Sequence, residues 1–290
     1  MTSIPSLFVG LCDDAALFPP GNAPLPDALP AHAVHLASGY ADLVGPLVFP
    51  VSRLGELAEH KVHDLELSLT APGGPEAVTA ALDTIAAIDG ASLVALEIAP
   101  RAEQSALDFF TALEALPAAV ADLDIFVEVP RGERRPDFLE ALRGSPFAAK
   151  FRTGGVVAEA YPDERELAEA LHTVVSDGTH FKATAGLHHA VRNTDPVTGF
   201  EQHGFLNLML ATRHALGGAG STQVAAALAE RDGGVLAREL TDLSAEVVDA
   251  VRRSFRSFGT CSVLEPLEDL MALGLVPSSV LTSASEGAHA

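Results

Sequence analysis

Residues 148–185 read AAKFRTGGVVAEAYPDERELAEALHTVVSDGTHFKATA, and this stretch is the clearest indication of the fold class. A short apolar run stands at each end, and both runs have the length and composition of buried strands. Between them, residues 163–176 carry the apolar periodicity of a helix, and the Asp-Gly pair at 177–178 marks a turn after it. The order strand, helix, strand predicts a β-α-β unit with two parallel strands.

The same alternation extends over nearly the whole chain of 290 residues. Strand-like runs cover residues 7–12, 46–50, 64–70, 92–98, 124–129, 148–153, 180–185 and 257–263. Helical patterns cover residues 30–43, 51–60, 75–89, 103–116, 134–143, 163–176 and several segments between 204 and 256. Eight strands that alternate with helices predict an α/β fold, a (β/α)8 TIM barrel. A doubly wound open sheet is the alternative, but no Gly-x-Gly-x-x-Gly follows the first strand.

The chain is expected to form one barrel domain over residues 1–278, followed by a loose tail over residues 279–290. Its longest connection is a helical insertion over residues 186–256, between the seventh and eighth strands. This insertion leaves the seventh strand at its carboxyl end, where barrel active sites lie. We therefore expect it to form a lid over the site or a contact between subunits.

The strongly negative net charge limits which kinds of molecule this protein is expected to bind. A net charge of −21 disfavours binding to nucleic acid, whereas a small anionic carbonyl or phosphate substrate can still enter a local basic pocket. No run approaches the ~20 apolar residues of a membrane span, and the N-terminus lacks the pattern of a signal peptide. Cys12 and Cys261 are too few for a disulfide framework. We expect a cytoplasmic protein without a membrane partner, and the apolar-rich chain is compatible with a homo-oligomer.

Lysine usage is the strongest hint at chemistry. The 18 basic residues comprise only three lysines, Lys61, Lys150 and Lys182, and 15 arginines. Arginine stays charged, whereas a buried lysine can lose its proton and act as a base or as a Schiff-base nucleophile. Lys61 lies in a polar stretch, but Lys150 and Lys182 lie in apolar runs one β-α unit apart.

Strand parity places five charges inside the predicted barrel. The outward faces must be apolar because helices cover them, so residues that alternate with the bulky apolar positions point inward. On this basis Glu97, Glu128, Lys150, Arg152 and Lys182 share the interior. Charges are rarely buried unpaired, because desolvation costs several kcal/mol per ion. The set is either an ion-pair layer that holds the barrel or an active site, and so many charges near the catalytic end favour the site.

Three strand ends resemble those of the deoxyribose-phosphate aldolase group of class I aldolases. Lys150-Phe-Arg-Thr-Gly154 is similar to that family's Lys-x-x-Thr-Gly strand, and Lys182-Ala-Thr-Ala-Gly186 is similar to the Lys-Ala-x-x-Gly strand that follows. Phe258-Gly-Thr-Cys-Ser262 resembles the last strand's Phe-Gly-x-Ser-Ser. The resemblance implies that Lys150 forms the Schiff base, that Lys182 tunes it, and that Ser262 helps to hold a substrate phosphate.

The chain departs from that family's pattern at several positions. The family's catalytic carboxylate is an aspartate, and here the candidates for proton relay are Glu97 and Glu128. Arg152 has no counterpart in the pattern, and two histidines follow soon after Gly186. We expect an aldolase-type lyase that needs no cofactor and acts on a small anionic carbonyl compound. Candidate substrate-binding residues are Arg152, Thr153, Gly154, Gly186, His188, His189, His203, Asn207, Ser262 and Asp14.

Aspartates and histidines leave a second function open. Asp13 and Asp14 end the first strand, and adjacent strand residues point to opposite sides, so we expect only one of them in the site. Together with His188, His189 and His203 they could hold one divalent metal ion in a metal-dependent hydrolase or lyase. His203 and Asn207 share a helix face at i, i+4. A non-catalytic barrel that binds small anions is a third alternative.

Overall fold

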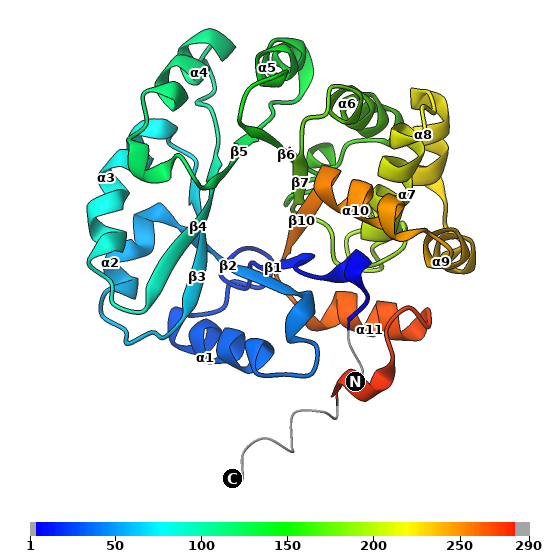
Figure 1. The fold of residues 1–290 in the computed structure, drawn as a ribbon, viewed down its shortest axis with the longest axis horizontal. Coiled ribbons are helices and arrows are strands. Elements are labelled where there is room, and N and C mark those ends of the chain that lie inside the picture. Colours follow the sequence, from blue (N-terminus) through cyan, green and yellow to red (C-terminus); the bar gives the residue numbers. More distant parts are fainter. Residues whose placement is uncertain (1–3, 282–290) are drawn as a thin grey trace.

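The computed structural model describes residues 4–281 and contains a closed barrel of eight parallel strands (Figure 1). The order around the barrel is β1-β10-β7-β6-β5-β4-β3-β2. The strands are β1 (Cys12–Asp14), β2 (Val44–Pro50), β3 (Leu65–Ala71), β4 (Ala91–Ile98), β5 (Asp124–Glu128), β6 (Ala148–Arg152), β7 (Phe181–Thr184) and β10 (Phe255–Thr260). The predicted (β/α)8 barrel is therefore confirmed.

Helices form the outer layer around these strands (Figure 1). They are α1 (Leu25–Leu36), α2 (Leu54–Leu57), α3 (Pro75–Ala86), α4 (Ala106–Glu114), α5 (Arg135–Leu142), α6 (Glu164–Ser176) and, after the last barrel strand, α11 (Leu264–Ala272). Short 3-10 helices are η1 (Ser6–Phe8), η2 (Ala41–Leu43), η3 (Val51–Arg53), η4 (Ala118–Val120), η5 (Gly132–Arg134), η6 (Ala158–Ala160) and η7 (Ser278–Leu281). None of the helices within residues 4–281 is long and apolar enough to cross a membrane.

The predicted insertion between the seventh and eighth barrel strands is confirmed. It holds a small hairpin of β8 (Asn193–Thr194) and β9 (Glu201–Gln202), followed by α7 (Phe205–Leu216), α8 (Ser221–Ala229), α9 (Gly233–Thr241) and α10 (Ala245–Ser254). Phe205 of α7 stacks on Phe258 of β10, with 5.0 Å between the ring centroids. Because α7 is apolar on nearly every side, it packs directly on the barrel wall while α8 packs against it and α6.

Two boundaries at the N-terminal end differ from the prediction. The first strand was expected over residues 7–12, but the apolar part of that run forms η1, and β1 begins only at Cys12. A short apolar run does not distinguish a strand from a buried helical turn. The first helix was expected over residues 30–43 and instead covers Leu25–Leu36, because Pro26 takes a first-turn position and Pro30 lies one turn further on.

The barrel interior changes from apolar to charged along the strands. Ala95, Phe126 and Ala148 form a small apolar cluster at the amino-terminal side. The charged side chains described below follow it, while large apolar residues of the same strands face the helices. At the other end of the chain, the expected tail begins within η7, where Val280 is fully buried, and its residues 282–290 lie outside the described residues.

Candidate functional site

Five charged side chains form a continuous series of ion pairs through the barrel interior. Lys182 Nζ lies 2.5 Å from Asp13 Oδ2 and 2.5 Å from Glu97 Oε1. Glu97 Oε2 lies 2.8 Å from Lys150 Nζ, which in turn lies 3.2 Å from Glu128 Oε2. We call Asp13, Lys182, Glu97, Lys150 and Glu128 the central charge chain. These contacts place both lysines and both glutamates inside the barrel, as strand parity predicts.

Strand register brings these residues to one level of the barrel. Glu128 of β5 is the register partner of Lys150 in β6, and Lys150 is the partner of Lys182 in β7. Partners in a parallel sheet project to the same side, so the three side chains line one stretch of the interior wall. Glu97 of β4, the strand next to β5, and Asp13 of β1, which β10 separates from β7, complete the series.

Neutral polar groups and one aromatic ring support the charges. The Ser68 hydroxyl donates to Glu97 Oε1 at 2.9 Å, and the Ser257 hydroxyl donates to Asp13 Oδ2 at 2.8 Å. Lys182 Nζ lies 5.1 Å from the centroid of the Phe126 ring, within the range of a cation–π contact. Every buried side-chain nitrogen or oxygen within residues 4–281 has a hydrogen-bond partner. The central charge chain is therefore fully satisfied at rest.

Electrostatics fix the protonation of the buried members. Burial alone would raise the pKa of Glu97, but the charges of Lys150 and Lys182 hold it well below its usual range. Burial alone would lower the pKa of Lys182, but the carboxylates of Asp13 and Glu97 outweigh this and raise it above its ordinary value. Burial raises the pKa of Asp13, and the charge of Lys182 offsets this only in part. Lys182 thus stays protonated, because its two carboxylate neighbours outweigh the effect of burial.

Exposure increases along the central charge chain. Asp13, Glu97 and Lys182 are buried, Lys150 is 5% exposed, and the Glu128 side chain is 21% exposed. Arg152 was expected inside the barrel, but its side chain is half-exposed and reaches Glu128 only at 3.9 Å. It is the last residue of β6, so its side chain leaves the interior at the rim. The Lys150 end of the chain therefore faces the carboxyl-terminal mouth.

The two aspartates of β1 point to opposite sides, as adjacent strand residues do. Asp13 enters the central charge chain, whereas Asp14 Oδ2 lies 2.9 Å from His32 Nδ1 of α1 and its Oδ1 accepts the Ala16 N–H at 3.0 Å. The expectation that one aspartate enters the interior is met. However, it is Asp13, which the sequence suggested only as a metal ligand, and not Asp14, which the sequence suggested as a substrate contact.

The loops after β6 and β7 fit closely against each other. A Cβ on Gly154 or on Gly186 would lie within 2.8 Å of the Tyr161 ring, and Gly186 has φ of +73°. Thr153 is buried, and its hydroxyl donates to the carbonyl oxygen of Ala185 at 2.7 Å. These three motif residues, expected to hold an anion, are explained locally by backbone packing and by a loop-to-loop hydrogen bond.

The remaining rim candidates lie near α11. His188 Nδ1 lies 3.2 Å from Glu265 Oε2 and 3.7 Å from Cys261 Sγ. His189 is exposed, and its Nδ1 lies 3.2 Å from an oxygen of Asp269. The hydroxyl of Ser262 accepts the Glu265 N–H at 3.3 Å, at the start of that helix. Each of these three candidates thus has a partner on or beside α11, and none has a contact with the central charge chain.

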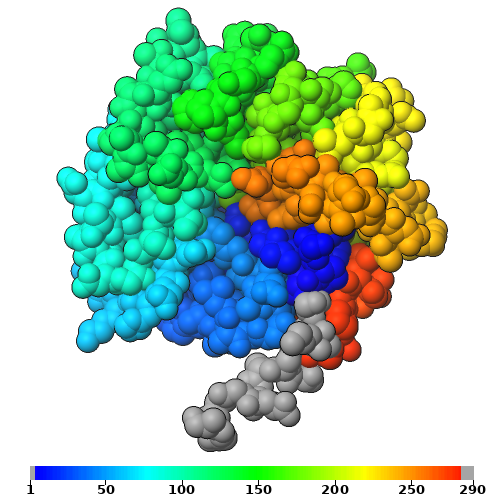
Figure 2. All heavy atoms as spheres, in the orientation of Figure 1, coloured from blue at the N-terminus to red at the C-terminus, as the bar shows by residue number. Residues whose placement is uncertain are grey.

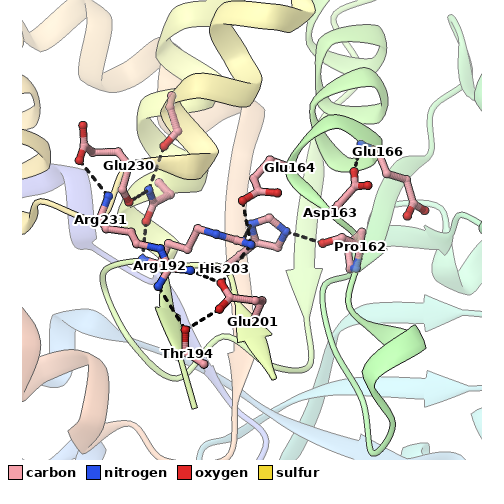
Figure 3. A network of polar contacts seen from close by, with 12 residues as sticks. Pro162, Asp163, Glu164, Glu166, Arg192, Thr194, Glu201, His203, Glu230 and Arg231 are labelled. Atoms are coloured by element: carbon pink, nitrogen blue, oxygen red, sulfur yellow. Dashed lines mark hydrogen bonds and ion pairs between the residues drawn. The ribbon is translucent and has the colours of Figure 1, made fainter. Parts of the chain in front are cut away.

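His203 belongs to a separate polar network (Figure 3), and Asn207 is joined to this network through Arg192. His203 Nε2 donates to the Pro162 carbonyl at 2.8 Å, and its Nδ1 accepts from Arg192 at 3.2 Å. Burial lowers the pKa of His203 to about 4, so the ring is neutral. Asn207 Oδ1 accepts the Arg192 N–H at 2.8 Å, and the side-chain amide donates to two carbonyl groups before α9. Neither side chain contacts the central charge chain: His203 joins the insertion to the loop before α6, and Asn207 joins segments of the insertion to one another.

The alternative metal site finds no common centre. Asp13 contacts Lys182, Asp14 contacts His32, and the two rim histidines contact α11, while His203 lies in the network of Figure 3. In the described part of the chain, no group of three or more His, Cys, Asp or Glu side chains is arranged to hold a metal ion. The five residues suggested as ligands are therefore not brought together.

Three polar supports, Ser68, Ser257 and His32, were not among the candidate site residues. Strand parity alone puts Ser68 on the inward face of β3, where its hydroxyl donates to Glu97. Ser257 lies within the expected last strand, next to the bulky Phe258, so the same alternation puts it inside, where it donates to Asp13. No motif marks His32 of α1, which is buried against Asp14.

No family model and no curated protein sequence matches this chain. Among solved structures it is similar to the crystal structure of DHDPS from Cyanidioschyzon merolae with lysine bound, at 15% sequence identity and a TM-score of 0.33. The alignment covers 93% of this chain and 99% of that chain. At this TM-score the similarity carries no argument about the chemistry, and the barrel rests on the observed strand pairing.

Proposed function

We propose that this protein is a class I aldolase-type lyase, in which Lys150 forms a Schiff base with a small anionic carbonyl compound. The observation that carries the proposal is the unequal setting of the two interior lysines. Lys182 is sealed between Asp13 and Glu97, whereas Lys150 lies next to the partly exposed Glu128 at the open end. A carbonyl carbon that enters from the carboxyl-terminal mouth can approach Lys150 without displacing the buried pairs.

The first step requires a neutral amine. Glu128, 3.2 Å from Lys150 Nζ, accepts a proton from the ammonium group, and the free amine then attacks the carbonyl carbon. Glu128 returns the proton to the hydroxyl of the carbinolamine, which leaves as water. The product is a positively charged iminium on Nζ, so the charge of the lysine is conserved. The iminium carries the same positive charge as the ammonium group that it replaces, so Glu97 can form an ion pair with it.

The iminium then serves as an electron sink. The substrate carries a hydroxyl on Cβ, counted from the iminium carbon, and a base removes the proton of this hydroxyl. The Cα–Cβ bond then breaks, Cβ leaves as an aldehyde, and the electrons of the bond move toward the iminium nitrogen. The resulting enamine is protonated on carbon, and water releases the second product from Lys150. Glu128 is the residue of the central charge chain placed to exchange these protons, because it is the one most exposed to the mouth.

The other members of the site act by position and charge. Lys182 keeps its proton and holds one oxygen of Glu97, so the other oxygen stays directed at Lys150. Arg152 is half-exposed at the rim and held by Glu128 only at 3.9 Å, so its guanidinium is available for a carboxylate or phosphate of the substrate. This pairing supports an anionic substrate rather than a neutral aldehyde.

Reduction with borohydride tests the proposal. The protein is incubated with pyruvate, acetaldehyde or glyceraldehyde 3-phosphate and reduced, and its intact mass is measured. We expect a single added group with at least one of these carbonyl compounds, which is lost in Lys150→Met and kept in the control Lys61→Met. No adduct with any carbonyl compound, or an adduct that persists in Lys150→Met, would refute the Schiff base. Saturable binding without an adduct would favour a non-catalytic anion-binding barrel.

A further inference from the structure

The opposite end of the barrel contains a cavity that the proposed reaction does not use. Its volume is about 690 Å³, within the range of small-molecule pockets. It lies between the segment that follows η1, the middle of β4, the first half of β5 and the end of α10. Figure 2 shows η1 in blue and α10 in orange next to each other on this face. The cavity reaches inward as far as Asp13 and Ser257, at the buried end of the central charge chain.

Three arginines line this cavity, which is unusual for a chain with a net charge of −21. Arg256 is paired with Asp124 at 3.5 Å. Within residues 4–281, neither Arg252 nor Arg253 has a carboxylate within ion-pair distance. Of the three lining carboxylates, Asp13 is paired with Lys182 and Asp124 with Arg256, which leaves Asp249 alone against two arginines. Among the described residues, the lining therefore holds two arginines, Arg252 and Arg253, without an ion-pair partner.

Arg252 is held in place by backbone groups. Its Nη1 donates to the Phe255 carbonyl at 2.8 Å, and its Nη2 donates to the Val9 carbonyl at 2.9 Å and to the Gly10 carbonyl at 3.4 Å. Burial lowers the pKa of Arg252 to about 10, although the charge of Asp13 opposes this shift. An arginine has five N–H donors, so Nε–H and a further Nη–H remain free of these bonds. A fixed guanidinium with free donors is suited to a planar or tetrahedral oxyanion.

Apart from Ser6, Ser257 and the charged groups, the cavity wall is largely apolar. Val9, Ala95 and Phe126 line it together with Val94 and Pro46. A pocket with a few charged groups at one side and apolar walls elsewhere selects a ligand with one charged group on a short apolar body.

We infer that this cavity is a separate binding site for a small organic anion, whose carboxylate or phosphate group pairs with Arg252 and Arg253. The apolar body of the ligand lies against Val9, Ala95 and Phe126. The site lies at the amino-terminal end of the strands and uses none of the residues proposed to react with the carbonyl compound. It therefore stands whether or not Lys150 forms a Schiff base.

Calorimetric titration tests this site with two probes, inorganic phosphate and butyrate, at an ionic strength held constant with sodium chloride. Arg253 is exposed, so Arg253→Gln should leave the fold intact, and Arg252→Lys keeps the charge while removing the guanidinium fork. Arg165→Gln, on the exposed face of α6, removes one positive charge elsewhere as a matched control. A thermal unfolding curve of each variant checks that it is folded.

We expect saturable binding of at least one probe, weakened at least fivefold by Arg253→Gln and by Arg252→Lys and less than twofold by Arg165→Gln. Lys150→Met should bind the probe as the unmodified protein does. Tighter binding of phosphate than of butyrate would identify a phosphate ligand, and the reverse a carboxylate. The inference is overturned if neither probe saturates, if Arg253→Gln and Arg165→Gln have the same effect, or if Lys150→Met abolishes binding.

Discussion

Glu97 is the residue on which the interior electrostatics depend, and Glu97→Gln tests this directly. The carboxylate holds Lys150 at 2.8 Å and Lys182 at 2.5 Å and is itself buried. Removing one partner of a buried ion pair costs about 3–5 kcal/mol, because the remaining charge loses its compensation. Glutamine keeps a carbonyl acceptor for one lysine, so we expect a loss near the lower end, about 3 kcal/mol.

Urea unfolding followed by circular dichroism measures this loss. With a slope of about 3 kcal/mol per M, the urea midpoint of Glu97→Gln should fall by about 1 M at pH 7. Glu66→Gln, an exposed change on β3, is the control and should stay within about 0.5 kcal/mol. A shift of the Glu97→Gln midpoint no larger than that of the control would refute the role given to this carboxylate.

The pH dependence of the same difference gives a second check. The pKa of Glu97 is depressed in the folded protein, so its contribution is present above its ordinary value of 4.5 and is lost as the pH falls toward the folded value. The difference between the unmodified protein and Glu97→Gln should therefore shrink below about pH 4.5. A difference that is the same at pH 7 and pH 3 would contradict the assignment of Glu97 as a buried ionised group.

Three further perturbations separate structural from chemical roles. In urea unfolding, Lys182→Met should cost about 3–5 kcal/mol, because it leaves the buried Asp13 without a cation and removes one of the two cations of Glu97. Lys150→Met should cost less, because its partner Glu128 reaches solvent, and equal losses would argue against the unequal setting of the two lysines. The pKa of His203 is about 4 in the folded protein, so this ring contributes stability above its ordinary pKa of 6.5 that is lost as the pH falls toward 4. His203→Gln should therefore make the free energy of unfolding fall less steeply between pH 6.5 and pH 4. An unchanged pH dependence in urea unfolding would exclude this ring as the cause. Gly186→Ala should lower the melting temperature more than Gly178→Ala. Both glycines have φ of +73°, but only a Cβ on Gly186 would also meet the ring of Tyr161. Equal shifts in calorimetry would mean that backbone strain accounts for the whole effect.

The barrel and most of its charged interior follow from alternation along the strands. Each of β4, β5, β6 and β7 is short and regular, so bulky apolar positions fix which side faces the helices, and the residues between them must point inward. This is why the amino-acid pattern alone places Glu97, Lys150 and Lys182 together. Strand parity predicts on which side of the sheet a side chain lies, but not how far along the barrel axis it lies. For this reason parity predicts a buried Arg152, whereas its side chain is half-exposed at the rim.

The errors arise where local pattern and tertiary packing differ. Asp13 and Asp14 have the same local surroundings, and only the true start of β1 decides which of them faces Lys182. His203 follows the loop that contains His188 and His189, which suggested a place in the site, yet its side chain joins the insertion to the loop before α6. No sequence pattern marks the cavity beside Arg252, because η1 and α10 are brought together from opposite ends of the chain.

Peptide mass spectrometry of the borohydride-reduced adduct shows directly which lysine reacts. Both interior lysines carry an amine, but only Lys150 lies beside a partly exposed carboxylate, so the modified peptide identifies the reactive residue. We expect the added mass on the peptide that contains Lys150 and none on the peptide that contains Lys182. An adduct on Lys182, or one confined to Lys61, would contradict the assignment of Lys150 as the nucleophile.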